Sequence, residues 1–334
     1  ETIYEAKRKC SNLKIFPPNY DFYKQKSKEL FVLLSNYTPD IEIASIDECY
    51  LDYTKVQKLY GDPIKFAEKI QKEINNKLGF TVNIGIAENK LCAKMASDFS
   101  KPNKIHTLYQ YEIKEKMFPL PIEDLFGVGK QTAEKLKFLG IKTIEDLALQ
   151  QEYNLKKIFK NQAKHLIEIA NGKDEDEVDS ARQSPKGISN EITLSEDVTN
   201  KKDLCKKLSI LSEMVSKRIR KENKYTKVVC VILKDNHFRR YSHQKKLKNP
   251  INTYEDIYKY SKQILEEFYQ NEPIRLIGIR LDDLTEIKNI QTSLFEKTSD
   301  LDKGEKLEQI MDEINNKYGK EVLKRASHIE KSSK

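Results

Sequence analysis

The chain alternates between two hydrophobic periods, one of about 3.6 residues and one of two residues. Apolar residues recur at helical spacing between Asn19 and Asn36 and again after Asp62 and Pro63, an N-cap and a first-turn proline, up to Gly79. Residues 1–10 and 89–100 are also typical of helices. Strand-like stretches fall at 41–47, 50–54, 80–87 and 105–109. This order predicts most of a split βαβ sheet with helices on one face.

After residue 110 the pattern changes to short helical stretches and then returns to strands. Residues 122–136 are typical of a helix, a glycine hairpin and a second helix. The segment 171–186 is polar and acidic without apolar periodicity, which predicts a linker. Beyond it we expect strands at 187–194, 227–234, 238–247 and 274–284 and helices at 203–220 and 254–269. The fold class is therefore α+β and multidomain, with a second sheet under two helices.

Composition narrows the class of protein without choosing a function. The 334 residues are 34% charged and carry a formal net charge of +8, which permits a polyanionic partner. No apolar run approaches the length of a membrane span, and the start does not resemble a signal peptide. Five scattered cysteines without a C-x-x-C pair predict neither a disulfide framework nor a zinc site. A reducing cytoplasm is the expected location.

Two adjacent carboxylates stand where the first two strands meet. Asp47 and Glu48 end the stretch 41–47 and precede the next strand. Carboxylates this close repel each other unless a proton or a cation lies between them. Because no His or Cys accompanies them, the expected cation is Mg²⁺ or Mn²⁺, carried with a phosphate-bearing substrate. The alternative is a solvated acidic turn, which is common at hairpin tips.

The residues around Asp47 and Glu48 form a longer motif. The sequence SIDECYLD at 45–52 resembles the palm signature of Y-family, or lesion-bypass, DNA polymerases, and the chain is closest to the bacterial DNA polymerase IV group. The resemblance implies a right-hand polymerase whose order is a remnant of the fingers (1–19), palm (20–110), helix-hairpin-helix thumb (111–173), linker (174–186), α+β little finger (187–288) and tail (289–334).

The implied activity is low-fidelity, template-directed extension of a primer 3′ end by two-metal phosphoryl transfer. Asp47 would bridge the two ions, and Glu48 would be the second ligand near the attacking hydroxyl. Primer-template DNA, deoxynucleoside triphosphates and a sliding clamp are the implied partners of a protein expected to be monomeric.

A second stretch, NIGIAENKLCAKMASDFSKPN at 83–103, resembles a sequence block that follows the palm hairpin in this family. By this resemblance Lys101 is the residue that reaches the triphosphate, whose transfer spreads negative charge over its oxygens. A solvated surface lysine is the alternative for any single lysine. Lys90 and Lys94 lie on the same expected helix, and for them a structural role and a backbone contact remain equally open.

Two further regions resemble DNA-contacting parts of the family. The hairpin of Gly127, Val128, Gly129 and Lys130 exposes backbone N–H groups that suit a phosphate oxygen, although glycine hairpins also serve packing alone. In the second sheet, basic residues on or beside strands predict a basic face toward a duplex. The residues assigned to DNA there are Arg239, Arg240, Arg275 and Arg280, with Lys245 and Lys246 nearby. Surface solubility is the alternative for each.

The sequence QTSLF at 291–295 resembles the peptide by which bacterial polymerases dock on the sliding clamp. Gln291, Leu294 and Phe295 would be its anchors, with the two apolar side chains in a pocket. Residues 306–325 have apolar positions at helical spacing and predict a short helix without an assigned role.

The family's palm begins with a strand that carries a further catalytic aspartate, and no such strand precedes residue 1 in this sequence. We therefore expect the sequence to lack the front of the protein. The chain in this form should bind metal weakly and polymerise poorly or not at all, whereas the full-length protein should be active. A non-catalytic DNA- and clamp-binding fragment is the alternative function. A nucleotide cyclase with a similar palm would explain neither the hairpin nor the second sheet.

Overall fold

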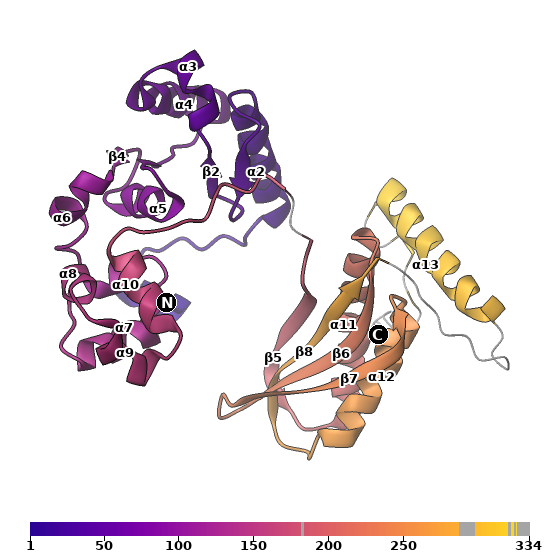
Figure 1. The fold of residues 1–334 in the computed structure, drawn as a ribbon. Coiled ribbons are helices and arrows are strands. Elements are labelled where there is room, and N and C mark those ends of the chain that lie inside the picture. The colour runs from indigo at the N-terminus through magenta and orange to yellow at the C-terminus, as the bar shows by residue number, and fades with distance from the viewer. Residues whose placement is uncertain (182–183, 287–297, 320–321, 324, 326–334) are drawn as a thin grey trace. The chain divides into compact units, whose positions relative to one another are not determined.

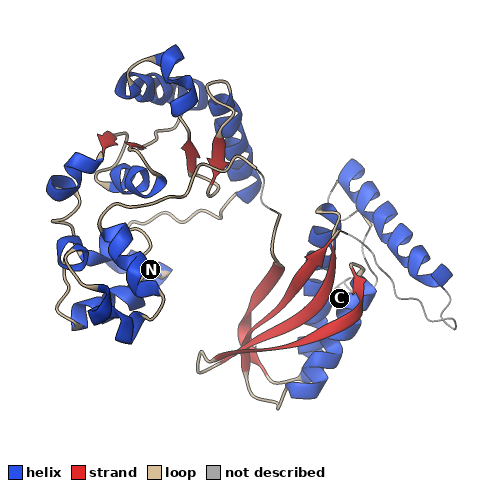
Figure 2. Cartoon of the chain, in the orientation of Figure 1, coloured by secondary structure: helices blue, strands red, loops and turns tan. Residues whose placement is uncertain are grey.

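The computed structural model describes residues 1–181, 184–286, 298–319, 322–323 and 325. They form two compact units, Glu1–Arg182 and Gln183–Lys334 (Figure 1). Both units combine helices with sheets (Figure 2), as the α+β class requires. None of the described helices is both long and apolar enough to cross a membrane.

The strands of the first unit form two separate sheets. β1 (Ile41–Ile43) pairs antiparallel with β2 (Cys49–Leu51), and β3 (Ile84–Ile86) pairs in parallel with β4 (Ile105–Thr107). The single continuous sheet expected from the sequence is therefore divided, because β2 and β3 each pair on one side only among the described residues. Each strand is also shorter than the stretch predicted from the sequence, because only three residues of each form strand hydrogen bonds with a neighbour.

Two long helices build a core over the first hairpin. α2 (Tyr20–Ser35) begins at the Asn19 cap, and α4 (Pro63–Leu78) begins at the Asp62 cap and ends at Gly79, whose φ of +74° is left-handed. Leu30 and Leu34 pack against α4. The shorter elements α1 (Ile3–Lys9), η1 (Thr54–Val56) and α3 (Gln57–Tyr60) flank this layer. The caps predicted from the sequence are confirmed.

α5 (Lys90–Asp98) lies against β3 and joins it to a helical region. A Cβ atom at Gly85 would lie 1.9 Å from the Ala93 carbonyl oxygen, so only glycine lets the helix and strand approach this closely. On its other side α5 shares one apolar core with the helices that follow. These elements are η2 (Gln110–Glu112), α6 (Ile113–Lys116), η3 (Ile122–Asp124), α7 (Lys130–Phe138), α8 (Ile144–Ala148), α9 (Glu152–Phe159) and α10 (Gln162–Ala170).

The second unit is a four-stranded antiparallel sheet in the order β5-β8-β6-β7, with two helices packed on one face (Figure 2). Its elements are β5 (Ile188–Val198), α11 (Lys201–Lys221), β6 (Tyr225–Asp235), β7 (Arg240–Ile251), α12 (Tyr254–Phe268) and β8 (Ile274–Thr285). The four strands and two helices agree with the sequence pattern. All four strands end later than predicted, and β5 and β7 also begin later.

α13 (Thr298–Tyr318) packs on the same unit through charged residues. The Arg220 guanidinium of α11 pairs with Glu308, and its Nε lies 2.8 Å from Asp312 Oδ2. The helix begins and ends earlier than the expected 306–325, and Gly319, which follows its last residue, has a φ of +115°.

Candidate functional site

The acidic pair lies in the tight turn between β1 and β2. The backbone N–H groups of Ala44 and Ser45 both donate to the Glu48 carbonyl, at 3.0 and 3.1 Å, which closes the turn. Ser45 Oγ donates to Asp47 Oδ1 at 2.6 Å, and both acidic residues are exposed. The shorter strands place the turn earlier than expected, so both carboxylates belong to the hairpin tip and neither to a strand.

A chain of ion pairs joins this turn to Lys101. Lys94 Nζ of α5 lies 2.6 Å from Glu48 Oε1 and 3.2 Å from Asp98 Oδ2, and Asp98 Oδ1 lies 2.8 Å from Lys101 Nζ. The Lys94 side chain is 15% exposed, whereas that of Lys101 is 62% exposed. Lys94 and Asp98 therefore connect the acidic turn to Lys101, the lysine predicted to contact phosphate. The sequence predicted no such connecting role for either residue.

These contacts also shift proton affinities. Although burial favours the neutral amine, hydrogen bonds to Glu48 and Asp98 raise the pKa of Lys94. Burial likewise opposes ionisation of Asp98, but hydrogen bonds from Lys101 and Lys94 lower its pKa below the ordinary value. Asp98 therefore stabilises the folded state above its unfolded-state pKa, and this contribution is lost as the pH falls through the lower folded-state pKa. Both shifts favour the charged forms of Lys94 and Asp98.

The glycine hairpin precedes α7. Gly127 has a φ of +94°, and Gly129 is the N-cap of α7 without a side-chain hydrogen bond. Lys130 is exposed at the first position of this helix. Val128 differs from the expectation: its side chain is buried, and its N–H donates to the Leu125 carbonyl at 2.9 Å. The first expected helix is only the short η3, which begins after the proline at 121 and ends before Leu125, whose backbone is extended.

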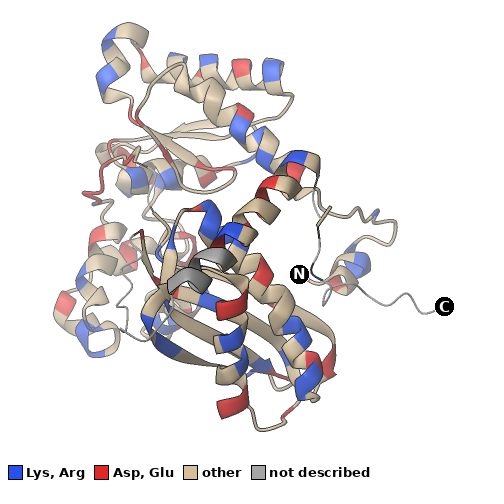
Figure 3. Ribbon diagram, turned by 90° about the vertical axis from the view of Figure 1, so that its right-hand side faces the viewer, with Lys and Arg blue, Asp and Glu red and all other residues tan. Residues whose placement is uncertain are grey.

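Arg240 and Arg280 lie on the face of the second sheet that α11 and α12 leave uncovered. In β8, Ile279 points into the core under the helices, so its neighbour Arg280 points to the other face. Arg280 Nε lies 2.7 Å from Asp282 Oδ2. Arg240 of β7 pairs across the same face with Glu191 of β5, the strand at the opposite edge of the sheet. This face therefore carries both signs of charge, as do the helices of both units (Figure 3).

Arg239 and Arg275 lie at one end of this sheet. Arg239 follows the β6–β7 turn, and its Nε lies 2.7 Å from Asp235 Oδ2. Arg275 stacks over the Phe238 ring at 5.1 Å and lies 3.7 Å from Asp197 Oδ1. Both guanidinium groups are substantially exposed.

Lys245 does not belong to the uncovered face. Its Nζ lies 3.5 Å from Glu267 Oε1 of α12, so it points toward the helical layer. Lys246 follows it in β7 and points the opposite way, because strand side chains alternate. Lys245 therefore lies outside the basic face that the sequence predicted. The predicted clamp-binding residues Gln291, Leu294 and Phe295 lie outside the described residues.

Two family models match the chain. Residues 1–98 match the impB/mucB/samB family, and residues 185–294 match the C-terminal domain of that family. A DNA polymerase IV of Clostridium acetobutylicum is 44% identical over all of this chain and 84% of its own length. The DNA polymerase IV 1 of Bacillus subtilis is 34% identical over 98% of this chain and 80% of its own length.

The chain belongs to the Y family of DNA polymerases.

Solved structures agree with this assignment. A Y-family DNA polymerase chimera built from Dbh and Dpo4 matches with a TM-score of 0.70 and 28% identity, over 84% of this chain and 81% of that one. The insertion ternary complex of Dbh DNA polymerase matches with a TM-score of 0.57, also at 28% identity, over 84% and 81%. As a Y-family member the protein is a DNA-directed DNA polymerase, which is a nucleotidyltransferase.

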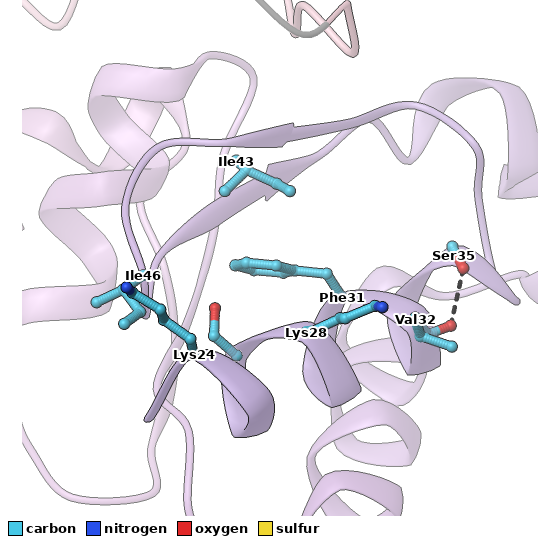
Figure 4. Close-up of a pocket in the computed structure, with 8 residues that line it drawn as sticks. Lys24, Lys28, Phe31, Val32, Ser35, Ile43 and Ile46 are labelled. Atoms are coloured by element: carbon cyan, nitrogen blue, oxygen red, sulfur yellow. Dashed lines mark hydrogen bonds between the residues drawn. The ribbon is translucent and has the colours of Figure 1, made fainter. Parts of the chain in front are cut away.

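An open apolar groove borders the acidic turn of this Y-family polymerase. It encloses about 430 Å³ between α2 and β1, with Ile43, Ile46 and Phe31 on its walls and Lys24 and Lys28 at its rim (Figure 4). Ile46 directly precedes Asp47, so the groove and the turn share backbone. Among the residues that the structure describes, no cluster of three or more His, Cys, Asp or Glu side chains has the geometry of a metal site.

The sequence assigned no role to Asp98 and left the role of Lys94 open, although both belong to the ion-pair chain of this polymerase. Their signal was the i, i+4 spacing of Lys94 and Asp98, which places the two side chains on one side of α5, while Lys101 follows the end of that helix. The pairing of Lys94 with Glu48 spans 46 residues of sequence, so no local sequence pattern predicts it.

Proposed function

We propose that the protein bypasses DNA lesions by adding deoxynucleotides to a primer 3′ end, with its reaction centre at the β1–β2 turn. The ion-pair chain from Glu48 through Lys94 and Asp98 to Lys101 supports this proposal most directly. It joins an acidic site suited to cations with a lysine suited to phosphate. In this proposal the first unit supplies palm (20–110) and thumb (111–173), and residues 187–288 form the little finger.

Asp47 and Glu48 are proposed to hold two Mg²⁺ ions, which Mn²⁺ could replace. Adjacent, exposed carboxylates without His or Cys neighbours offer the hard oxygen ligands that these ions prefer. Bound ions would supply Lewis acidity toward the attacking hydroxyl and the triphosphate. The Ser45 hydroxyl orients Asp47, and the Lys94 ammonium orients Glu48. These contacts would keep the two carboxylates from turning away from the site.

Lys101 is proposed to contact the β- and γ-phosphates of the incoming nucleotide. Its side chain is more exposed than that of Lys94, so it can leave Asp98 for a phosphate without opening the core. Charge accumulates on the leaving pyrophosphate during transfer, so this contact would strengthen in the transition state.

Replacing Lys101 by alanine tests this role. We expect kcat/KM for the deoxynucleotide in primer extension to fall by about 10- to 100-fold, because a charge-assisted hydrogen bond is lost. Lys104→Ala is the matched control, since Lys104 is an exposed lysine three residues away. Single-nucleotide incorporation kinetics measure both. Equal kcat/KM values for Lys101→Ala and the unmodified protein would contradict the proposed role.

Primer-template DNA is proposed to lie against the glycine hairpin and the uncovered face of the second sheet. The first N–H groups of α7 have no side-chain cap from Gly129, and Lys130 adds a positive charge beside them. These groups suit a phosphate oxygen in any sequence context. Arg240 and Arg280 would reach the backbone from the sheet, each oriented by its acidic partner.

Lys130→Ala tests the hairpin contact through its salt dependence. Each phosphate contact releases about one counterion, so we expect the slope of log K against log salt to decrease by about 1. Lys135→Ala, at the other end of α7, is expected to leave the slope nearly unchanged. Fluorescence anisotropy of labelled primer-template from low to moderate salt measures both. An unchanged slope for Lys130→Ala would remove Lys130 from the interface.

Residues 291–295 are proposed to dock on a sliding clamp through Leu294 and Phe295, and the protein is proposed to act as a monomer. The support for clamp docking is the QTSLF sequence and its position after the second sheet.

A further inference from the structure

The position of α5 determines how far Lys94, Asp98 and Lys101 lie from the acidic turn. The helix carries Lys94 and Asp98 and leads directly into Lys101, so a shift of this helix would move all three side chains relative to the acidic turn. Its middle is fixed by close packing on Gly85 of β3. Its N-terminus is held in a different way.

The segment after α10 returns to the N-terminus of α5. Figure 1 shows it running past α5 toward the β1–β2 hairpin. The Leu91 N–H donates to Asp174 Oδ2 at 3.0 Å, and the Asn89 side-chain amide donates to the Gly172 carbonyl at 2.8 Å. Each of these contacts joins residues 83 positions apart in the chain. We call residues 172–179 the strap.

The strap fits closely where it meets the helix. Gly172 is buried and has a φ of +69°. A Cβ atom there would lie 2.2 Å from Ile113 Cδ1 and 3.1 Å from Cys92 Sγ. Only glycine combines this backbone conformation with this approach. The contact therefore involves shape as well as hydrogen bonds.

The other end of the strap meets the strand that leads into the acidic turn. Glu42 of β1 accepts a hydrogen bond from the Asp179 N–H at 2.9 Å and pairs with Lys90 Nζ at 3.0 Å. One carboxylate thus connects the strap, the first residue of α5 and β1. The strap therefore forms hydrogen bonds both with the N-terminus of α5 and with β1, the strand before the acidic turn.

We infer that Asp174 is a positioning residue, whose carboxylate caps α5 and so holds Lys94 and Lys101 in register with the acidic turn. The inference rests on the proposed function of Lys101. The first N–H groups of a helix have no partner within it, and a carboxylate beside them also interacts favourably with the helix dipole. Asn89 Oδ1 accepts from the Cys92 N–H at 2.8 Å, so Asp174 supplies the cap for the neighbouring Leu91 N–H.

Three variants of the strap separate this role from a general loss of charge. Asp174→Ala removes the cap, and Asp174→Asn keeps an oxygen that can accept from Leu91. Glu175→Gln is the matched control, because Glu175 is an exposed acid at the next position. Two measurements apply to each variant: hydrogen exchange of the Leu91 amide without nucleotide, and KM and kcat for the deoxynucleotide in primer extension.

We expect Asp174→Ala to speed exchange at Leu91 and to raise the KM by roughly threefold to tenfold, with kcat changed less than about twofold. Asp174→Asn should recover more than half of each effect on a logarithmic scale, and Glu175→Gln should resemble the unmodified protein. Unchanged exchange in Asp174→Ala would overturn the cap. Faster exchange with an unchanged KM would overturn the positioning role.

The two proposals fail in different ways. An unchanged KM and kcat in Lys101→Ala would overturn the proposed phosphate contact and, with it, this inference. A normal KM in Asp174→Ala beside a raised KM in Lys101→Ala would overturn the positioning role alone.

Discussion

Asp47→Asn is expected to reduce primer extension by about 100- to 1,000-fold, because the change removes a negative charge from the proposed metal site while keeping the size of the side chain. The Ser45 hydroxyl can still donate to the remaining amide oxygen, so the turn should keep its shape. Pre-steady-state incorporation of one deoxynucleotide measures the loss.

Two controls make this result specific to the turn. Glu68→Gln changes the same charge at an exposed position of α4 and should leave incorporation unaffected. Binding of primer-template by Asp47→Asn should remain within about threefold of the unmodified protein, because phosphate contacts from elsewhere supply that affinity. Incorporation by Asp47→Asn at the unmodified rate would show that the reaction centre lies elsewhere.

Gly85→Ala is expected to have the largest effect on stability. A Cβ atom at this position would overlap the Ala93 carbonyl, at 1.9 Å, and approach the Ser97 nitrogen at 2.6 Å, so α5 has to move away from β3. Overpacking of this kind typically costs about 3 kcal/mol, which lowers the Tm of a unit of this size by roughly 6 to 12 °C. Polymerase activity should fall below the level that the remaining folded fraction explains, because Lys94 and Asp98 move with the helix.

Differential scanning calorimetry measures the stability change. Gly304→Ala is the control, because a Cβ atom at Gly304 meets no atom within 4 Å and its φ is not left-handed. It should leave the Tm unchanged or slightly higher. A Tm for Gly85→Ala within about 1 °C of the unmodified protein would contradict the close packing of α5 on β3.

Much of the architecture could be predicted from local sequence signals. Asp62-Pro63 and Gly79 marked both ends of α4, because capping depends on residues adjacent to the helix end. The second sheet was predictable from its alternating strands. The division of the first set of strands into two sheets was not, because strand pairing depends on which backbone groups are neighbours in space.

The candidate site was only partly predictable, for a similar reason. Asp47 and Glu48 are adjacent in sequence, so the acidic turn was found directly. Lys94 binds Glu48 across 46 residues, and Asp174 reaches Leu91 across 83, so spacing carries no signal for either contact. The burial of Val128 also depends on tertiary packing, because its side chain joins the apolar core that α5 shares with the helices after it.

The most direct test of the account is to count divalent ions at the acidic turn. Mn²⁺ bound by the protein with primer-template and a non-hydrolysable deoxynucleotide analogue can be titrated by electron paramagnetic resonance. We expect the unmodified protein to bind two more Mn²⁺ ions than the same DNA and nucleotide bind alone, and the double variant Asp47→Asn, Glu48→Gln to lose at least one of them. Identical Mn²⁺ binding by both proteins would contradict the claim that these two carboxylates hold the ions for nucleotide transfer.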